Sequence, residues 1–153
     1  MIALERGQLW VMRIHAVAAG LVAVALAVVG EAVLRAEIGV RAGVVIVPML
    51  IVLVYPVLIA PGRKYQAWGY RMEHEELRIA RGTWNRTETL VPLVRVQHID
   101  ISQGPLERGF GVSRLVLHTA GTMNSRVVLP GLARPTAEAM RDAIRAHIRR
   151  DEP

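Results

Sequence analysis

The sequence predicts an α+β membrane protein, in which two apolar helices precede a domain of antiparallel strands closed by one amphipathic helix. The first observation is an uneven distribution of charge along the 153 residues, of which 52% are apolar. Residues 1–62 carry four Arg against three Glu, whereas residues 63–153 carry fifteen basic and ten acidic side chains. The second observation is that the hydrophobic period changes from helical to strand-like at Trp68. Together they exclude a disordered chain and a simple water-soluble globule.

Two apolar segments, at about residues 14–34 and 42–60, are each long enough to cross a bilayer. A helix of ~19 residues rising ~1.5 Å per residue spans about 28 Å, which matches the hydrocarbon layer. Neither segment has a polar stripe, and the second follows the first too closely for the first to be a cleaved signal peptide. We therefore expect a transmembrane hairpin within residues 1–62 and a cytoplasmic domain in residues 63–153.

The basic residues that flank the two spans predict their orientation. Five basic residues precede the first span or follow the second: Arg6, Arg13, Arg63, Lys64 and Arg71. The segment that connects the two spans has only Arg35 and Arg41. Because cytoplasmic flanks are enriched in Lys and Arg, both termini are expected in the cytoplasm, with the helices in the plasma (inner) membrane. Aromatic residues suited to the same interface are Trp10, Tyr65 and Trp68.

Polar residues and prolines within the spans have structural interpretations. Glu31 lies near the outer end of the first span, and Arg35 follows it at the spacing of a helical ion pair. We therefore expect Glu31 to be paired with Arg35. Pro48 and Pro56 are expected to kink the second helix.

The second half of the chain reads as six or seven antiparallel strands separated by turn residues. The phase of the alternation changes near Gln97 and His98, which predicts a β-bulge, and Pro92 predicts an edge strand or a strand start. The expected turns are Glu73–Glu75, the Asn85 region, Gly104–Pro105 and Ala120–Asn124. The expected strands are 68–72, 76–84, 86–93, 95–103, 113–120 and 125–130.

A helix is predicted at about residues 135–150, with Pro135 at its start and Thr136 as its cap. Its apolar stripe, expected to pack on the strands, comprises Ala137, Met140, Ile144 and Ile148. A basic row lies on another face of this helix and is expected to stay solvated. Together with two residues after the second span it forms the candidate lipid-facing set: Arg63, Lys64, Arg141, Arg145 and Arg149.

Three sequence patterns resemble catalytic, metal-binding or phosphate-binding sites, but a structural role explains each of them better. His98, Asp100 and Ser102 alternate on one strand, which places Ser102 too far from His98 for a hydrolytic triad. His74, Glu75 and Glu76 are consecutive turn residues and lack metal-ligand spacing. Residues 104–111 lack the spacing of a phosphate loop, and Phe110 is expected in the core. We expect no catalytic residue, metal or cofactor, and scattered charges argue against nucleic-acid binding.

Five short motifs together resemble the bacterial PH-like membrane proteins of the YdbS type. They are Arg95-Val96-Gln97-His98-Ile99, Gln103-Gly104-Pro105-Leu106-Glu107-Arg108, Phe110-Gly111-Val112, Leu117-His118-Thr119-Ala120-Gly121 and Leu129-Pro130-Gly131-Leu132. The resemblance covers nearly the whole chain, both apolar segments included. It implies a PH-like (pleckstrin-homology-like) split β-barrel with a C-terminal helix, fixed to the inner face of the plasma membrane.

The resemblance carries no catalytic residues, and it implies a membrane-protein complex with a larger relative that repeats the membrane-plus-PH unit. A homo-oligomer is a further possibility. The leading hypothesis is therefore a non-catalytic, membrane-anchored interaction or scaffold module; the alternatives are a sensor of anionic lipids and, remotely, an enzyme. The candidate residues for partner binding or for structure are Arg95, Gln97, His98, Gln103, Glu107 and Arg108.

Overall fold

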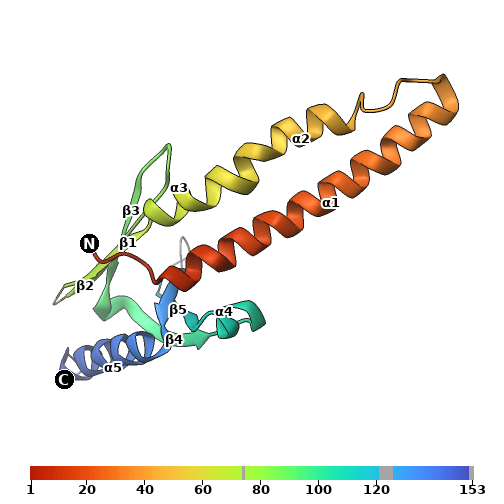
Figure 1. Cartoon of the computed structure of the whole chain (residues 1–153). Helices are drawn as coiled ribbons and strands as arrows, with labels where there is room; N and C mark the ends of the chain where they lie inside the picture. Colours follow the sequence, from red (N-terminus) through yellow and green to blue (C-terminus); the bar gives the residue numbers. More distant parts are fainter. Residues whose placement is uncertain (74, 121–125, 152–153) are drawn as a thin grey trace. The chain divides into compact units, whose positions relative to one another are not determined.

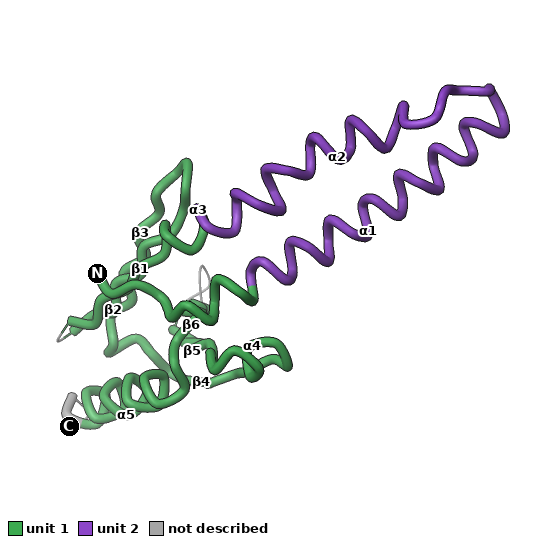
Figure 2. Tube along the Cα trace, in the orientation of Figure 1, with its two compact units in different colours: residues 1–11, 64–153 green, residues 12–63 purple. Residues whose placement is uncertain are grey.

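The computed structural model describes residues 1–73, 75–120 and 126–151 (Figure 1). The chain forms two compact units (Figure 2). One unit comprises Met1–Val11 and Lys64–Pro153, and the other comprises Met12–Arg63. His74 and residues 121–124 of the last predicted turn lie outside the described residues.

The N-terminal part is dominated by two long apolar helices. Helix α1 spans Arg6–Ile38, and the second helix runs through Ile46–Gln66 as three consecutive parts. These parts are α2 (Ile46–Val54), the π-helical segment η1 (Tyr55–Ile59) and α3 (Ala60–Gln66). Both helices are long and apolar enough to cross a membrane, and only 17% and 6% of their most apolar stretches are buried. Core helices of a water-soluble domain would be mostly covered, so the exposure fits contact with lipid.

The two prolines of the second helix have different surroundings. Pro56 lies in the π-helical segment, where the regular hydrogen-bond ladder is interrupted. Pro48 is the third residue of α2, and its missing N–H matters little in a first turn. The kink predicted at Pro48 is therefore not required by a lost hydrogen bond, and the kink predicted at Pro56 falls in the π-helical segment.

The predicted pairing of Glu31 with Arg35 is wrong. The Glu31 side chain is buried, and its carboxylate accepts hydrogen bonds from the backbone amides of Gly43, Val45 and Ile46. These amides lie at the start of the second helix, where backbone N–H groups have no intrahelical acceptor. A carboxylate there satisfies several donors at once, whereas Arg35 would offer one exposed ion pair.

Six strands form two antiparallel sheets of three in the described part of the chain. The first sheet has the order β1 (Gly69–Met72), β2 (Glu76–Arg81), β3 (Thr87–Pro92). The second has the order β4 (Val96–Ser102), β5 (Val112–Thr119), β6 (Arg126–Ala133). The predicted bulge is confirmed, because the register between β4 and β5 shifts between Val96 and His98. Pro92 ends the edge strand β3, as the sequence indicated.

The N-terminal segment closes one side of the two sheets. Ile2 exchanges backbone hydrogen bonds with Tyr70 of β1, and the amide of Glu5 donates to the carbonyl of Gly131 in β6. The Tyr65 hydroxyl donates to the carbonyl of Leu4 at 2.7 Å and fixes the same segment. Residues 2–5 therefore cover the outer edges of β1 and β6, while β3 and β4 remain the edge strands on the other side.

Helix α5 (Arg134–Asp151) packs its apolar stripe on the core, as predicted. Ala137, Met140 and Ile144 are buried, and Ile148 is partly buried. The predicted cap at Thr136 is wrong, because β6 ends at Ala133 and the helix begins at the next residue. The core also receives Leu93 from the 3-10 turn η2 (Leu93–Arg95) and side chains from both sheets, including Leu77, Ile79, Val91, Leu115, Leu117, Leu129 and Leu132.

The Gly104–Pro105 turn is in fact the start of a short helix, α4 (Pro105–Gly109). Proline suits the first turn of a helix, and buried Glu107 accepts a hydrogen bond from the amide of Gly104 at 2.7 Å. Phe110 follows this helix and is 38% exposed, so its predicted place in the core is wrong. The helical turn directs Phe110 outward, and Val112 takes the buried position instead.

Candidate functional site

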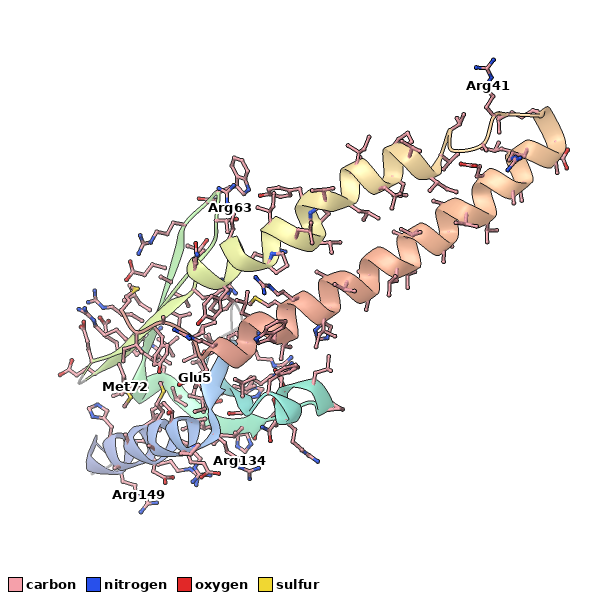
Figure 3. All side chains as sticks on the ribbon, in the orientation of Figure 1. Glu5, Arg41, Arg63, Met72, Arg134 and Arg149 are labelled. Atoms are coloured by element: carbon pink, nitrogen blue, oxygen red, sulfur yellow. The ribbon has the colours of Figure 1, made fainter. Side chains whose placement is uncertain are left out.

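A groove runs between strand β4 and helix α5, and we call it the β4–α5 groove. One hollow of about 300 Å³ lies between Val96–Ile99 and the end of α5 at Arg145, Ile148 and Arg149. A second, of about 240 Å³, lies between the later part of β4 and the first half of α5. Both hollows are lined by Ile99 and Arg145, so they are consecutive parts of one groove. Figure 3 labels Arg134 and Arg149, which line its two ends on α5.

The β4 wall combines an apolar floor with an open strand edge. Val96 and Ile99 are buried and form the floor, whereas Gln97, His98 and Asp100 are exposed. Only β5 pairs with β4 among the described strands. Backbone N–H and C=O groups on the outer side of β4 therefore have no strand partner in this part of the chain. Such an edge can accept an added strand.

The α5 wall is basic, and its charges differ in how well they are compensated. Arg141 pairs with Asp142 at 2.8 Å, and Arg134 pairs with Glu138 at 3.0 Å. The hydrogen bond from Arg141 holds the pKa of the Asp142 carboxyl below its ordinary value. Arg145, by contrast, has no acidic partner within ion-pair distance among the residues that the structure describes.

Arg149 at the end of the groove is exposed like Arg145, and it likewise has no ion pair with a described residue. Both guanidinium groups line the hollow beside Val96–Ile99. This end of the groove therefore carries two arginines that no described acidic side chain contacts at ion-pair distance, with Asp142 acting on Arg145 only through space.

A polar cluster of two histidines and one carboxylate lies on the outer face of the second sheet. Asp100 Oδ1 is 3.0 Å from His98 Nε2, and Asp100 Oδ2 is 3.4 Å from His118 Nε2. The two imidazole rings are 5.9 Å apart between centroids. His118 was missed in the sequence because only the β4–β5 register, which pairs it with His98, brings it to Asp100.

The predicted partner-binding residues separate into two groups. Gln97 and His98 line the groove, and so does Gln103, whose side-chain amide also donates to the carbonyl of Val112 at 2.8 Å. Glu107 is buried and forms an ion pair with Arg114 of β5 at 2.7 Å, so its contacts are structural. The remaining two members, exposed residues outside the groove lining, are Arg95 and Arg108.

The residues predicted to contact lipid also fall into two groups, those that line the groove and those that do not. The three arginines of α5 line the groove: Arg145 and Arg149 share a hollow with Gln97 and His98, and Arg141 lines the hollow beside Asp100. Arg63 and Lys64 are exposed residues of α3 and do not line it. Of the aromatic anchors, Trp10 is exposed, whereas Tyr65 and Trp68 are partly buried against the core.

The groove has features of a binding surface. His98 contacts Asp100, while Ser102 lies opposite Arg114 in the strand register, so His98 and Ser102 are not partners. Among the residues that the structure describes, no group of three acidic or histidine side chains could hold a metal ion. An open strand edge beside arginines that have no close acidic partner fits an extended segment with acidic side chains.

Comparison with known proteins gives two matches. The sequence model of a family described as bacterial PH domain matches residues 7–148, which include both apolar helices. The UPF0699 transmembrane protein YdbS of Bacillus subtilis (strain 168) is 36% identical over 88 residues, covering 58% of this chain and 54% of that protein. The chain thus spans about half the length of this relative. No solved structure matches the chain significantly.

Proposed function

The chain belongs to the bacterial PH domain family, and from this premise we propose that it is a non-catalytic, membrane-anchored interaction module. In this proposal the two apolar helices form a transmembrane hairpin in the plasma membrane. The two sheets and α5 form a PH-like split barrel that faces the cytoplasm. The similarity to a transmembrane protein and the two membrane-capable helices support the anchoring.

The β4–α5 groove is the observation that carries the proposed binding role. An extended segment can pair with the open edge of β4 through its backbone, which gives affinity largely independent of sequence. Alternate side chains of such a segment would point toward the hollows above Ile99. The apolar floor and polar rim together match the usual anatomy of a specific interface.

Charge gives the groove its specificity. Arg145 and Arg149 offer planar guanidinium groups, which bind carboxylates through paired hydrogen bonds. The pairing of Arg134 with Glu138 leaves the opposite end nearly neutral. We therefore propose a partner segment that is extended and carries acidic side chains toward the Arg145–Arg149 end.

The proposed partner is another membrane protein, because a module anchored in a bilayer most readily meets partners anchored in the same bilayer. The first candidate is a larger relative with repeated membrane-plus-PH units, as the family resemblance implies. A second copy of this chain is the competing partner. Both termini are placed in the cytoplasm in this proposal, on the basis of the five basic residues that flank the pair of helices against two in their connection.

Photo-crosslinking in native membranes tests the proposed groove. A photoreactive amino acid replaces Gln97 in the full-length protein, and mass spectrometry identifies the crosslinked segment. The proposal expects an acidic segment, whose capture is lost in the Arg145→Gln/Arg149→Gln variant but kept in Arg108→Gln, which removes an exposed charge outside the groove. Capture that is insensitive to the double variant, or of a basic segment, would contradict the proposal. Crosslinking to a second copy would identify a homo-oligomer.

A further inference from the structure

The loop that joins β2 to β3 carries an unusually exposed tryptophan. Trp84 is 83% exposed, more than any other large apolar side chain in the described part of the chain. Even the side chains of the apolar helices reach only 70%, at Ile38. Tryptophan is usually well covered by its own domain, whereas at membrane–water interfaces its amphipathic ring is enriched.

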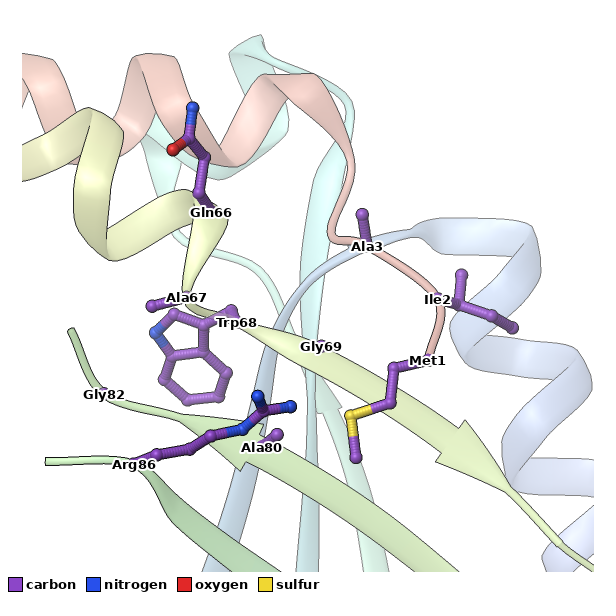
Figure 4. Close-up of a pocket in the computed structure, with 10 residues that line it drawn as sticks. All are labelled: Met1, Ile2, Ala3, Gln66, Ala67, Trp68, Gly69, Ala80, Gly82 and Arg86. Atoms are coloured by element: carbon purple, nitrogen blue, oxygen red, sulfur yellow. The ribbon is translucent and has the colours of Figure 1, made fainter.

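This loop lies at the end of the first sheet where the chain leaves the second membrane-capable helix. Gln66 is the last residue of that helix, and it lines a pocket of about 290 Å³ together with Trp68, Gly82 and Arg86 (Figure 4). The strand register agrees, because Gly69 at the start of β1 pairs with Ala80 near the end of β2. The β2–β3 loop is therefore a neighbour of residues 66–68 within one compact unit.

The two ends of the same sheet differ in their excess charge. At its other end, Glu73, Glu75 and Glu76 lie at and beside the turn between β1 and β2, where Arg71 and Arg78 form ion pairs with Glu73 and Glu76, so one glutamate remains in excess. The β2–β3 end instead carries Arg81 and Arg86 on either side of Trp84. The paired length of four residues separates the two ends by about 10 Å, at ~3.3 Å per residue. The end with Arg81 and Arg86 is thus the one beside residues 66–68, and the end with the excess glutamate is the other one.

We propose that the β2–β3 loop, Gly82–Arg86, is a membrane-contact element that binds anionic phospholipid. The Trp84 indole lies in the headgroup region, and Arg81 and Arg86 bind lipid phosphates. Arg86 also lines the pocket beside Trp68, which gives a phosphate a place between the loop and the end of the helix. This contact rests on the membrane anchoring proposed above but not on the β4–α5 groove, and it would hold the domain in one orientation on the bilayer.

The absence of cysteine allows a single spin label to report on the loop. Asn85→Cys, labelled with a nitroxide, is placed in the full-length protein in nanodiscs of phosphatidylglycerol and phosphatidylcholine. Power saturation then compares accessibility to oxygen, which concentrates in lipid, with accessibility to a water-soluble nickel chelate. We expect the label at position 85 to be several-fold more accessible to oxygen relative to nickel than a label at Glu75→Cys, an exposed residue of the end with the excess glutamate.

Variants of the loop test separately the role of the Trp84 indole and the role of the two arginines. Trp84→Ala should return the label to water in every bilayer, while Arg81→Gln/Arg86→Gln should remove only the additional immersion that phosphatidylglycerol gives and leave the label as in phosphatidylcholine alone. Arg95→Gln, an exposed charge beyond the opposite end of β3, should change nothing. A label at position 85 that is as water-accessible as the one at position 75, or that is insensitive to Trp84→Ala, would overturn the inference. Shielding from both reagents would also overturn it, because it would indicate a protein contact. Failure of position 97 in the otherwise wild-type protein to crosslink any partner, with the loop still immersed, would contradict the groove alone.

Discussion

The Oε1 atom of Glu31 lies 2.6 Å from the backbone nitrogen of Gly43, twelve residues further along the chain. The other carboxylate oxygen accepts from the amides of Val45 and Ile46, each at 3.1 Å. One side chain of the first helix thus satisfies three backbone donors at the start of the second. The charge that seemed out of place in an apolar segment therefore joins the two helices of one unit and fixes where the second begins.

Removal of this carboxylate should loosen the start of the second helix. In Glu31→Ala the amides of Gly43, Val45 and Ile46 lose their acceptor, and we expect their hydrogen exchange to become faster. Glu31→Gln keeps one carbonyl oxygen and should fall between Ala and wild type. Hydrogen–deuterium exchange with mass spectrometry, on the full-length protein in nanodiscs, measures this effect.

Glu37→Ala is the matched control, because Glu37 is an exposed residue of the same helix. It should leave exchange at residues 43–46 unchanged. Equal exchange in Glu31→Ala and Glu37→Ala would show that the carboxylate does not hold the second helix.

The order of helices and strands could be predicted from the sequence because periodicity reports it directly. The bulge near His98 and the stripe of α5 at Ala137, Met140 and Ile144 were readable for this reason. Contacts between residues far apart in the chain could not be predicted from the sequence. For Glu31, the sequence offered only a nearby partner such as Arg35. The same limit explains why the proximity of Asp100 to His118 was missed.

The candidate groove needed the structure for a related reason. Gln97 on β4 and Arg145 on α5 are far apart in the sequence, and each looked like part of a separate surface. Only the packing of α5 beside the edge of β4 brings them to one groove. Trp84 was missed because the sequence predicts a strand to residue 84, whereas β2 ends at Arg81 and leaves Trp84 on an exposed loop.

The ion pair between Glu107 and Arg114 should stabilise the corner that α4 forms. Glu107 is buried and also accepts the Gly104 amide, so Glu107→Ala leaves a donor unsatisfied and should cost about 1–3 kcal/mol. Chemical denaturation of the full-length protein in detergent, followed by circular dichroism, measures the loss. Arg108→Ala, an exposed neighbour in the same helix, should change stability by less than about 0.5 kcal/mol. Comparable losses in the two variants would rule out a special role for the buried pair.

The apolar stripe of α5 should be essential for folding, whereas its outer face should not. Ile144 is fully buried, so Ile144→Asp places an unpaired charge in the core and should cost about 4 kcal/mol or more, close to the whole stability of a small domain. Ala146→Asp introduces the same charge two residues away on an exposed position and should be tolerated. Near-ultraviolet circular dichroism and resistance to proteolysis distinguish the two. A folded Ile144→Asp variant would show that α5 is not part of the core.

Reporter fusions test the proposed orientation of the helices. Alkaline phosphatase and a cytoplasmic fluorescent protein are fused in turn after Ile38 and after the C-terminus. The basic residues that flank the pair predict phosphatase activity only at Ile38 and fluorescence only at the C-terminus. Exchanging the charges, with Arg6→Gln/Arg13→Gln and two added lysines in the connection, should increase the fraction of inverted protein. An active phosphatase at the C-terminus of the wild type would reverse the proposed topology.

Two glycines with the same backbone conformation should respond differently to alanine. Gly111 and Gly131 have φ angles of +68° and +71°, so a side chain costs about 1–2 kcal/mol of conformational energy at either position. A methyl group on Gly111 would meet no atom within 4 Å, whereas one on Gly131 would lie 2.8 Å from the Cβ of Gln8. Gly131→Ala should therefore lose a further ~1–3 kcal/mol, because crowding pushes the N-terminal segment away from β6.

Denaturation of both variants in detergent, with hydrogen exchange at the amides of Ile2 and Glu5, separates the two effects. Gly131→Ala should speed exchange at these amides, whose acceptors are the carbonyls of Tyr70 and Gly131, whereas Gly111→Ala should leave it as in the wild type. Since the conformational cost is common to the two variants, the difference between them measures the packing of the N-terminal segment on β6. If both variants lose equal stability and protect Ile2 and Glu5 equally, the N-terminal segment does not close this edge of the sheets.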